Sequence, residues 1–176
     1  NSMFGMGVPI NRMEEIAARL GADCAFFVKS EPCFATGIGD MMQPVRLNLD
    51  KYWIVVVKPP ISVSTKEAFS GIRPQKPPRC CREIIEEEPV EKWRGLLHND
   101  FEKTIFKIHP ELSAVKEKLY AEGAVYAAMS GSGSALFGLF NNKPQSINTQ
   151  TFSIDGCRIE TASLRGMAEQ FPIVSE

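Results

Sequence analysis

A Gly-Ser run between two apolar segments is the feature that most restricts how this chain can fold. Residues 127–140 read AAMSGSGSALFGLF, so that glycine and serine occupy every position from Ser130 to Ser134. Apolar segments of strand length on either side of such a run are typical of two strands joined by a tight loop. Because Gly131 and Gly133 tolerate positive φ, the loop can also aim successive N–H groups at an anion. The sequence leaves both a mobile hairpin tip and an anion site open.

Further strand candidates lie on both sides of this loop. Residues 22–28 and 32–39 are short and rich in apolar and aromatic side chains, and residues 51–60 form a nearly continuous apolar run that ends in Pro-Pro. Such runs, bounded by glycine or proline, are typical of strands, and proline cannot extend a central ladder. Residues 156–164 supply one more candidate near the C-terminus.

Helical patterns alternate with these strands. The clearest helix is expected at residues 11–20, with Asn11 and Glu14 spaced as a capping box and Gly21 as its stop. Further helices are expected at residues 64–69, where Ser64 or Thr65 is the cap, and at 97–108 and 109–123. Separated strands with helices between them predict an α+β fold, an antiparallel sheet with helices packed on one face. At 176 residues and 44% hydrophobic, the chain is expected to form a single domain over residues 1–176.

Composition argues against several classes of protein. A formal net charge of -1 gives no basic footprint for nucleic acid. The five cysteines contain no CxxC pair and the chain has only two histidines, so we expect no metal site and a reducing, cytoplasmic setting. No segment has the roughly 20 apolar residues that a membrane-spanning helix needs, and no signal peptide is recognisable. The chain opens on Asn1, and we expect that it begins inside a longer protein.

Two polar segments have mainly structural interpretations. Residues 70–82 carry four prolines and glycines and no apolar period, so we expect an exposed loop that is open to proteases. The acidic run at 83–93 is expected to be a solvated helix face, because its carboxylates cluster on neighbouring positions without the turns of a metal loop.

A few side chains could carry chemistry. Asp23 lies just past a helix stop and before apolar residues, so it is either a turn aspartate or a base that accepts a proton from an alcohol. Asn99, with the acids at 100 and 102, has the pattern of a helix start, which explains these residues locally. His98 and His109 lack the strand-turn context of a nucleophilic triad.

Four segments taken in order resemble the GHMP superfamily of galactokinase, homoserine kinase, mevalonate kinase and phosphomevalonate kinase. They are LGADCAFF, KPPISVSTKEAF, LHNDFE and MSGSGSALFGLF. The Pro-Pro strand end and NDFE are similar to the branch that acts on a cytidyl diphosphate substrate. The resemblance covers residues 1 to about 140, and it implies a ferredoxin-like C-terminal domain on the substrate side of a kinase, with residues 1–20 as a helix left from the domain junction.

The resemblance also implies roles for individual residues. Asp23 matches the aspartate that deprotonates or orients the hydroxyl attacking the γ-phosphate of ATP. Phe69 matches an aromatic residue that stacks on cytosine, although it could instead be a core residue of its helix. Thr65 matches a position near the same pocket, but a helix cap would also explain it. Gly131, Ser132 and Gly133 match the third signature motif, a glycine loop beside the phosphates, which favours the active-site interpretation of the Gly-Ser run.

The implied reaction is transfer of phosphate from ATP, with Mg²⁺, to the 2-hydroxyl of 4-diphosphocytidyl-2-C-methyl-D-erythritol in non-mevalonate isoprenoid synthesis. Two departures qualify the match. Cys24-Ala25 replace the Val-Pro that commonly follows the aspartate, and the family's ATP-binding loop and its lysine would lie upstream of residue 1, so the chain alone is expected to be inactive without the missing N-terminal domain. The alternatives are a mevalonate or homoserine type of GHMP kinase, or a noncatalytic ferredoxin-like module that binds a small molecule.

Overall fold

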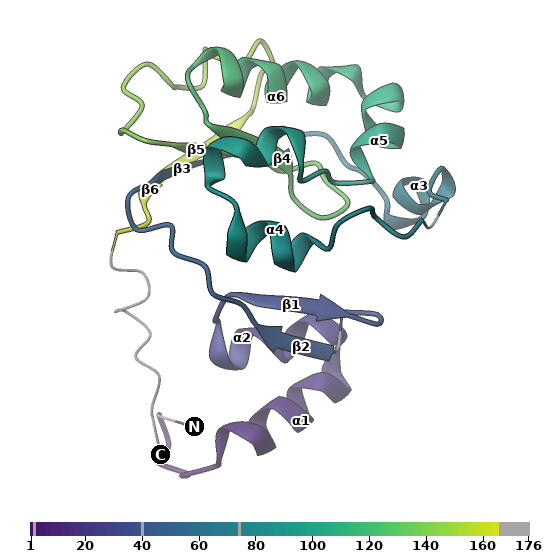
Figure 1. Ribbon diagram of the computed structural model, residues 1–176, viewed down its shortest axis with the longest axis vertical. Coiled ribbons are helices and arrows are strands. Elements are labelled where there is room, and N and C mark those ends of the chain that lie inside the picture. The colour runs from purple at the N-terminus through teal and green to yellow at the C-terminus, as the bar shows by residue number, and fades with distance from the viewer. Residues whose placement is uncertain (2, 40, 74, 166–176) are drawn as a thin grey trace. The chain divides into compact units, whose positions relative to one another are not determined.

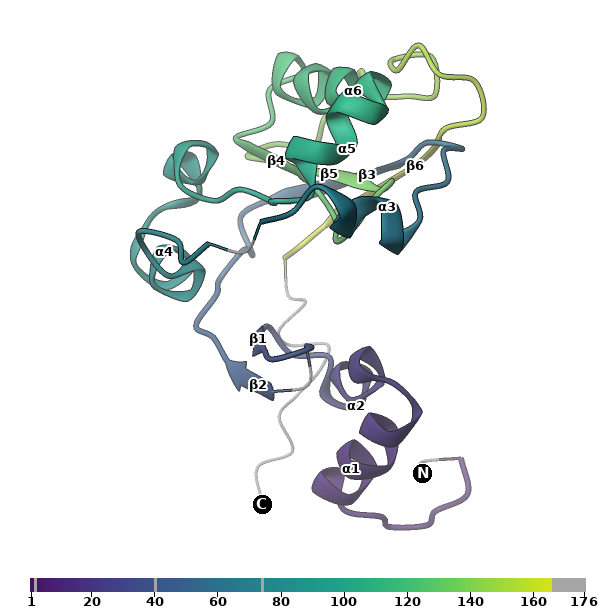
Figure 2. The same cartoon turned by 90° about the vertical axis from the view of Figure 1, so that its right-hand side faces the viewer.

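The computed structural model describes residues 1, 3–39, 41–73 and 75–165. Its contacts divide the chain into two compact units, of which the first begins with Asn1–Asn48 and the second covers Leu49–Gly166. We call them unit 1 and unit 2 and describe each by itself. Figure 1 and Figure 2 show their elements from two sides. The single domain expected over the whole chain stays a prediction, because a grouping of contacts does not decide whether two units fold together.

Unit 1 is built from short elements. Its helices are α1 (Ile10–Leu20), the 3-10 turn η1 (Ala22–Cys24) and α2 (Phe26–Lys29), and its strands are β1 (Cys33–Thr36) and β2 (Met41–Pro44). The two strands pair antiparallel as a hairpin (Figure 1). None of the residues of the range 1–48 is buried, apart from residues 2, 22 and 40, whose burial is not described. Unit 1 therefore has helices and a hairpin without a core of fully buried side chains.

Two predictions for unit 1 are wrong and two are confirmed. The strand expected within 32–39 forms as β1. The helix at 11–20 is confirmed, but it starts at Ile10 after Pro9. Asn11 lies inside it, where its Oδ1 accepts from the adjacent Arg12 N, and no side chain caps this helix, so the capping box does not form. Residues 22–28 are helical and not a strand. Their backbone groups bond locally, Ser30 N donating to Phe26 O. A short apolar run fits either state by pattern alone.

Unit 2 contains the main sheet. Its strands are β3 (Trp53–Lys58), β4 (Tyr126–Met129), β5 (Leu136–Phe140) and β6 (Arg158–Ser163), in the order β4-β5-β3-β6 with every neighbouring pair antiparallel. Its helices are α3 (Thr65–Ser70), α4 (Cys81–Glu87), the 3-10 segment η2 (Val90–Gly95), α5 (Glu102–Ile108) and α6 (Pro110–Ala121). This strand order is that of a ferredoxin-like fold, with the connection from β5 to β6 formed by a helix-free loop. The strands expected around the Gly-Ser run and at 51–60 and 156–164 are confirmed.

The core of unit 2 lies between one face of the sheet and α5 and α6. Val55 and Val57 of β3 are fully buried together with Leu112 and Leu119 of α6 and Ile105 of α5. Each such aliphatic side chain contributes on the order of 1.5–3 kcal/mol by leaving water. The remaining members of the core come from α3, α6, β4, β5, the residue Ala124 before β4 and the loop before β6. The sheet therefore holds its helices by a continuous apolar layer, as the 3.6-residue periodicity of α6 predicts.

The opposite face of the sheet is covered in part by η2. Trp93 packs edge to face against Tyr126 of β4, with their ring centroids 5.6 Å apart. Burial raises the pKa of the Tyr126 hydroxyl well above its usual range. Figure 1 shows α4 and α6 on opposite sides of the sheet, and Figure 2 agrees.

The polar segments of unit 2 match their predictions in part, because the loop expected at 70–82 ends where α4 begins at Cys81. The described residues between Ser70 and Pro78 are almost all exposed, while Pro74 lies outside the described residues. The acidic run forms α4 and η2, and Arg79 pairs with Glu87 and Glu88 at its edge. Hydrogen bonds from Arg79 and then Lys92 lower the pKa of the Glu88 carboxyl. No helix among the described residues is long and apolar enough to cross a bilayer.

Candidate active site

The Gly-Ser loop between β4 and β5 is a shaped turn. Gly131 and Gly133 have positive φ of 54° and 90°. Gly133 N donates to Ser130 O at 3.0 Å, and Ser130 N donates to Ala135 O at 2.8 Å. The φ of Gly133 favours glycine, and a Cβ added there would lie 2.7 Å from Met129 Sδ, so the Met129 side chain would have to shift. The loop therefore has a defined internal hydrogen-bond pattern.

Ser134 anchors the end of the loop to the segment that follows β3. Only 1% of the residue is exposed. Its Oγ donates to Ile61 O and accepts from Lys58 Nζ. A buried hydroxyl needs such partners, because an unpaired one costs about 1–3 kcal/mol. No local pattern separates Ser134 from the other serines of the run, and its role appears only when β3 and β5 pair.

Asn99 and Glu102 contact the other end of the loop. Asn99 Nδ2 donates to Met129 O and to Gly131 O, both at 2.8 Å, while its Oδ1 accepts from Phe101 N at 2.9 Å. Glu102 is buried, with Oε1 accepting from Met129 N at 2.7 Å and Oε2 paired with Lys116 Nζ at 2.6 Å. The interpretation of these residues as a purely local helix start is wrong, because α5 has no side-chain cap and both side chains reach a distant loop.

Phe69 and Thr65 lie on α3, which begins after the Pro-Pro segment. The Ser64 side chain caps this helix by accepting from Glu67 N at 3.1 Å, and Thr65 is its exposed first residue. Phe69 is 59% exposed, and its ring packs edge to face against Phe101 with centroids 4.9 Å apart. One side of the Phe69 ring is therefore fixed by protein while much of the ring remains in contact with solvent.

α3 is held close to α5 at two further positions. A Cβ added at Gly71 would lie 2.3 Å from Thr104 Oγ1, so only glycine allows the end of α3 to approach α5 this closely. His109 Nε2 lies 3.5 Å from Glu67 Oε1, and His109 Nδ1 lies 3.6 Å from Glu111 Oε1. Together with the bond from Asn99 to the Gly-Ser loop and the packing of Phe101 on Phe69, these contacts link both α3 and the loop to α5 and the residues before it.

Asp23 belongs to unit 1, whereas the other candidate residues belong to unit 2. It lies in η1, directly after α1, and its side chain is exposed. Its Oδ1 lies 3.9 Å from the position that a Cβ on Gly39 would occupy, so the carboxylate faces the turn before β2. The structure thus links the glycine loop and Phe69 through Asn99 and Phe101, at the start of α5. Asp23 lies in unit 1.

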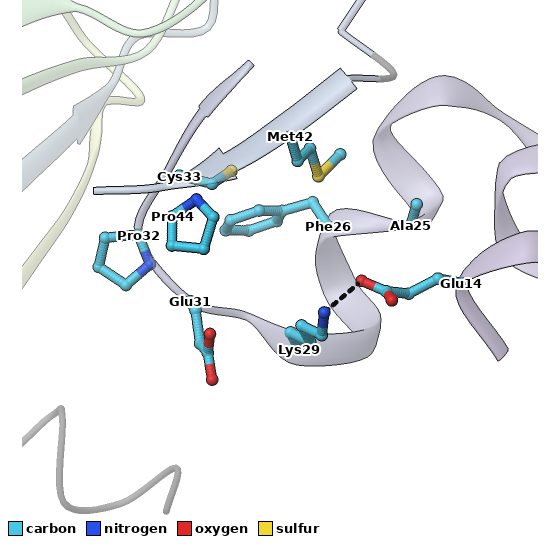
Figure 3. Close-up of a pocket in the computed structure, with 9 residues that line it drawn as sticks. All are labelled: Glu14, Ala25, Phe26, Lys29, Glu31, Pro32, Cys33, Met42 and Pro44. Atoms are coloured by element: carbon cyan, nitrogen blue, oxygen red, sulfur yellow. Dashed lines mark ion pairs between the residues drawn. The ribbon is translucent and has the colours of Figure 1, made fainter. Parts of the chain in front are cut away.

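A small pocket of unit 1 contains none of the candidate residues. Figure 3 shows it between α2 and the hairpin, with the Lys29 and Glu14 side chains paired at 3.0 Å beside it. The residues that line it are Glu14, Ala25, Phe26, Lys29, Glu31, Pro32, Cys33, Met42 and Pro44. Its volume of about 60 Å³ has room for a few water molecules and not for a nucleotide.

Metal-binding and redox side chains do not gather in the part of the chain that the structure describes. No group of three or more His, Cys, Asp or Glu side chains there could hold a metal ion. All five cysteines are free thiols. Burial raises the pKa of Cys81 and of Cys157, which disfavours the reactive thiolate at both positions.

Comparison with known proteins gives one consistent family. The model of the GHMP kinase C-terminal region matches residues 82–150. The 4-diphosphocytidyl-2-C-methyl-D-erythritol kinase of Bacteroides fragilis is 50% identical over 141 residues, which are 80% of this chain and 51% of that protein. The enzyme of the same name from Parabacteroides distasonis is 43% identical over 160 residues, 89% of this chain and 59% of that protein. The chain therefore spans little more than half the length of these relatives.

Solved structures agree with the fold. A crystal structure of 4-(cytidine 5'-diphospho)-2C-methyl-D-erythritol kinase matches with a TM-score of 0.64 and 30% identity, over 78% of this chain and 50% of that one. A homoserine kinase from Cytophaga hutchinsonii matches with a TM-score of 0.67 over 92% of this chain and 60% of that one, but at 16% identity it supports the fold alone. The predicted α+β class and the resemblance found in the four motifs are confirmed.

Proposed function

The chain belongs to the GHMP kinases, as a homologue of the 4-diphosphocytidyl-2-C-methyl-D-erythritol kinases, and from this premise we propose that it is the C-terminal part of such a kinase. The intact enzyme transfers the γ-phosphate of ATP to the 2-hydroxyl of 4-diphosphocytidyl-2-C-methyl-D-erythritol. One observation carries the proposal beyond similarity. Three of the four motifs, which are separated in sequence, meet through α5 in unit 2, where Asn99 bonds the Gly-Ser loop and Phe101 packs on Phe69.

Phe69 is the proposed platform for the cytosine ring. Its exposure leaves a π face for stacking, and Phe101 restrains its orientation before a ligand arrives. Stacking of a base on an aromatic side chain contributes about 1–3 kcal/mol. Thr65, one turn earlier on the same helix, is the proposed polar neighbour of the bound cytidyl group.

The Gly-Ser loop is the proposed wall beside the phosphates. The positive φ of Gly131 allows the backbone of Gly131 and Ser132 to present N–H groups on one side, as an anion requires, while Gly133 N donates within the loop to Ser130 O. Catalysis of phosphoryl transfer depends mainly on positioning and charge stabilisation, so a loop fixed at both ends suits this task.

Asp23 is the proposed base. It accepts or orients the proton of the 2-hydroxyl while that oxygen bonds to the γ-phosphorus, the bond from phosphorus to the bridging oxygen breaks, and ADP leaves. An exposed carboxylate directly after a helix is accessible to a substrate. Cys24 and Ala25 behind it leave the carboxylate chemistry unchanged.

ATP and Mg²⁺ depend in this proposal on an N-terminal domain. The chain spans about half the length of its relatives, and the described residues offer no metal cluster of their own. The triphosphate and its Mg²⁺ are assigned to a Gly-Ser-rich loop and a lysine of that domain. Free thiols support a cytoplasmic location.

The test is release of ADP by the protein with its upstream coding region restored. The cytidyl substrate, mevalonate and homoserine are offered in parallel, and phosphorus NMR identifies the phosphorylated hydroxyl. We expect turnover with the cytidyl compound alone and phosphate on its 2-hydroxyl. Turnover with homoserine or mevalonate would assign a sister kinase, and no turnover by a folded protein that binds ATP would leave a noncatalytic binding module.

A further inference from the structure

We infer that Asn99 and Glu102 are positioning residues that fix the Gly-Ser loop for phosphoryl transfer, and that Phe101 between them links this loop to Phe69. We call Asn99, Phe101 and Glu102 the loop clamp. The inference deepens the proposed function and rests on it for the kinetic readout. Its structural part rests on hydrogen bonds alone, so the loop clamp and the proposed function can be refuted separately.

Both polar side chains of the clamp bind the same strand residue. Met129 is the last residue of β4, and the Gly-Ser run begins at the next position. Its N–H donates to Glu102 Oε1 at 2.7 Å, and its C=O accepts from Asn99 Nδ2 at 2.8 Å. Because β4 is at the edge of the sheet in the part of the chain that the structure describes, its outer backbone groups have no neighbouring strand there to pair with. The clamp supplies those partners where the loop leaves the sheet.

Asn99 uses both N–H donors of its side-chain amide, which a helix cap does not need. Its Oδ1 accepts from Phe101 N in a local turn before α5, and α5 itself has no side-chain cap. The two N–H donors of the amide instead go to Met129 O and Gly131 O, and so reach into the loop itself. An amide is required at this position, because a carboxylate has no donor for these carbonyls.

Glu102 is too deeply buried for a residue that only favours the helix dipole. The residue is 9% exposed, and burial of a carboxylate is costly unless it is paired and hydrogen-bonded. Lys116 of α6 supplies the opposite charge at 2.6 Å. The charged pair thereby joins α5, α6 and the end of β4. The start of the Gly-Ser loop is thus anchored to the two helices that cover the sheet.

Within the clamp, Phe101 makes the link to Phe69, the proposed platform for the cytosine ring. Its backbone N–H is held by Asn99, and its ring lies against Phe69. A displacement of the Asn99 side chain would therefore shift the Gly-Ser loop, which the amide donors hold. It would also shift Phe69, through the backbone of Phe101. The two effects are separable, because a variant that retains an oxygen acceptor for Phe101 N retains the link to Phe69.

The decisive variant is Asn99→Asp in the full-length enzyme. Aspartate retains the acceptor for Phe101 N and is favoured near a helix start, but it sets a carboxylate oxygen against two carbonyl oxygens. We expect kcat to fall by about 10- to 100-fold, since misplacement of a site by 1 Å has effects of this order. The KM for the cytidyl substrate should change by less than about threefold, because the link to Phe69 remains.

Lys103→Gln is the matched control. Lys103 is an exposed residue of the first turn of α5, and the substitution changes the net charge by the same amount as Asn99→Asp. We expect its kcat to equal that of the wild type. Asn99→Ala, which removes donors and acceptor without adding charge, provides a milder variant and should lower kcat while also raising KM.

Hydrogen exchange of the segment 129–134 in the substrate-free protein supplies a readout that does not depend on activity. We expect exchange in this segment to speed up by about tenfold or more in Asn99→Asp and to stay unchanged in Lys103→Gln. Faster exchange without any kinase activity in the wild type would retain the clamp and refute the proposed function. Wild-type kcat and wild-type exchange in both Asn99 variants would overturn the clamp while the kinase assignment stands.

Discussion

The two units of the chain differ in how their helices use apolar side chains. In unit 2, Leu112 of α6 is fully buried in a core shared by helices and sheet. In unit 1, Leu20 of α1 is 80% exposed, and α1 has no buried residue although its apolar side chains follow a helical period. The same pattern of sequence thus forms a core in one unit and an uncovered apolar face in the other. The difference locates the stability of the described chain in unit 2.

The largest expected effect of this difference is on the folding of fragments. Residues 49–165 alone should unfold cooperatively on heating, because the buried core lies within them. Residues 1–48 alone should show no cooperative transition, since helices of 11 residues or fewer and a single hairpin are marginal in water. Circular dichroism and dispersion of amide proton signals measure both. A cooperative transition in the 1–48 fragment would break the comparison.

A matched pair of leucines sharpens the comparison within the whole chain. Leu112→Ala should lower the free energy of unfolding by about 2–5 kcal/mol, because it removes buried methyl groups and leaves a cavity. Leu20→Ala, the same substitution on an exposed helix position, should change it by less than about 0.5 kcal/mol. Urea denaturation of both variants gives the two values. Equal losses of unfolding free energy in the two variants would mean that another part of the chain covers Leu20 in solution.

Charged pairs should show a smaller contrast of the same kind. Glu102→Ala removes a buried acceptor and leaves Lys116 and Met129 N without their partner, so we expect a loss of about 1–3 kcal/mol. Glu14→Ala removes a half-exposed partner of Lys29, and surface pairs contribute about 0–1 kcal/mol. The same urea experiments compare them. A loss for Glu14→Ala that equals or exceeds the loss for Glu102→Ala would refute the ranking.

Much of the fold follows from local patterns in the sequence. The strands around the Gly-Ser run and the run at 51–60 were predictable, because glycine or proline bounds each apolar segment of strand length. The helix α6 was predictable from its helical period and from Pro110 at its first position. The segment 22–28 was not, since Phe26, Phe27 and Val28 are apolar without alternation and fit a helix as well as a strand.

The candidate site was predictable only in its parts. The glycines of the loop and the position of Phe69 could be singled out from motifs, but their supports could not. Ser134 binds Ile61, which is 73 residues away in sequence, and Asn99 reaches Gly131 across 32 residues. Such contacts exist only after the sheet has paired and α5 has packed on it. A local pattern therefore assigned Asn99 to a helix cap, while its amide serves the loop.

The measurement that tests the central claim most directly is the turnover of Asp23→Asn in the full-length protein, measured beside the wild type with ATP and the cytidyl substrate. Asparagine keeps the size of the side chain and cannot accept the proton as a carboxylate does. The kinase account predicts that ADP release falls by about 100-fold or more while the protein remains folded and still binds the substrate. Wild-type turnover in Asp23→Asn would contradict the assignment of Asp23 as the catalytic base.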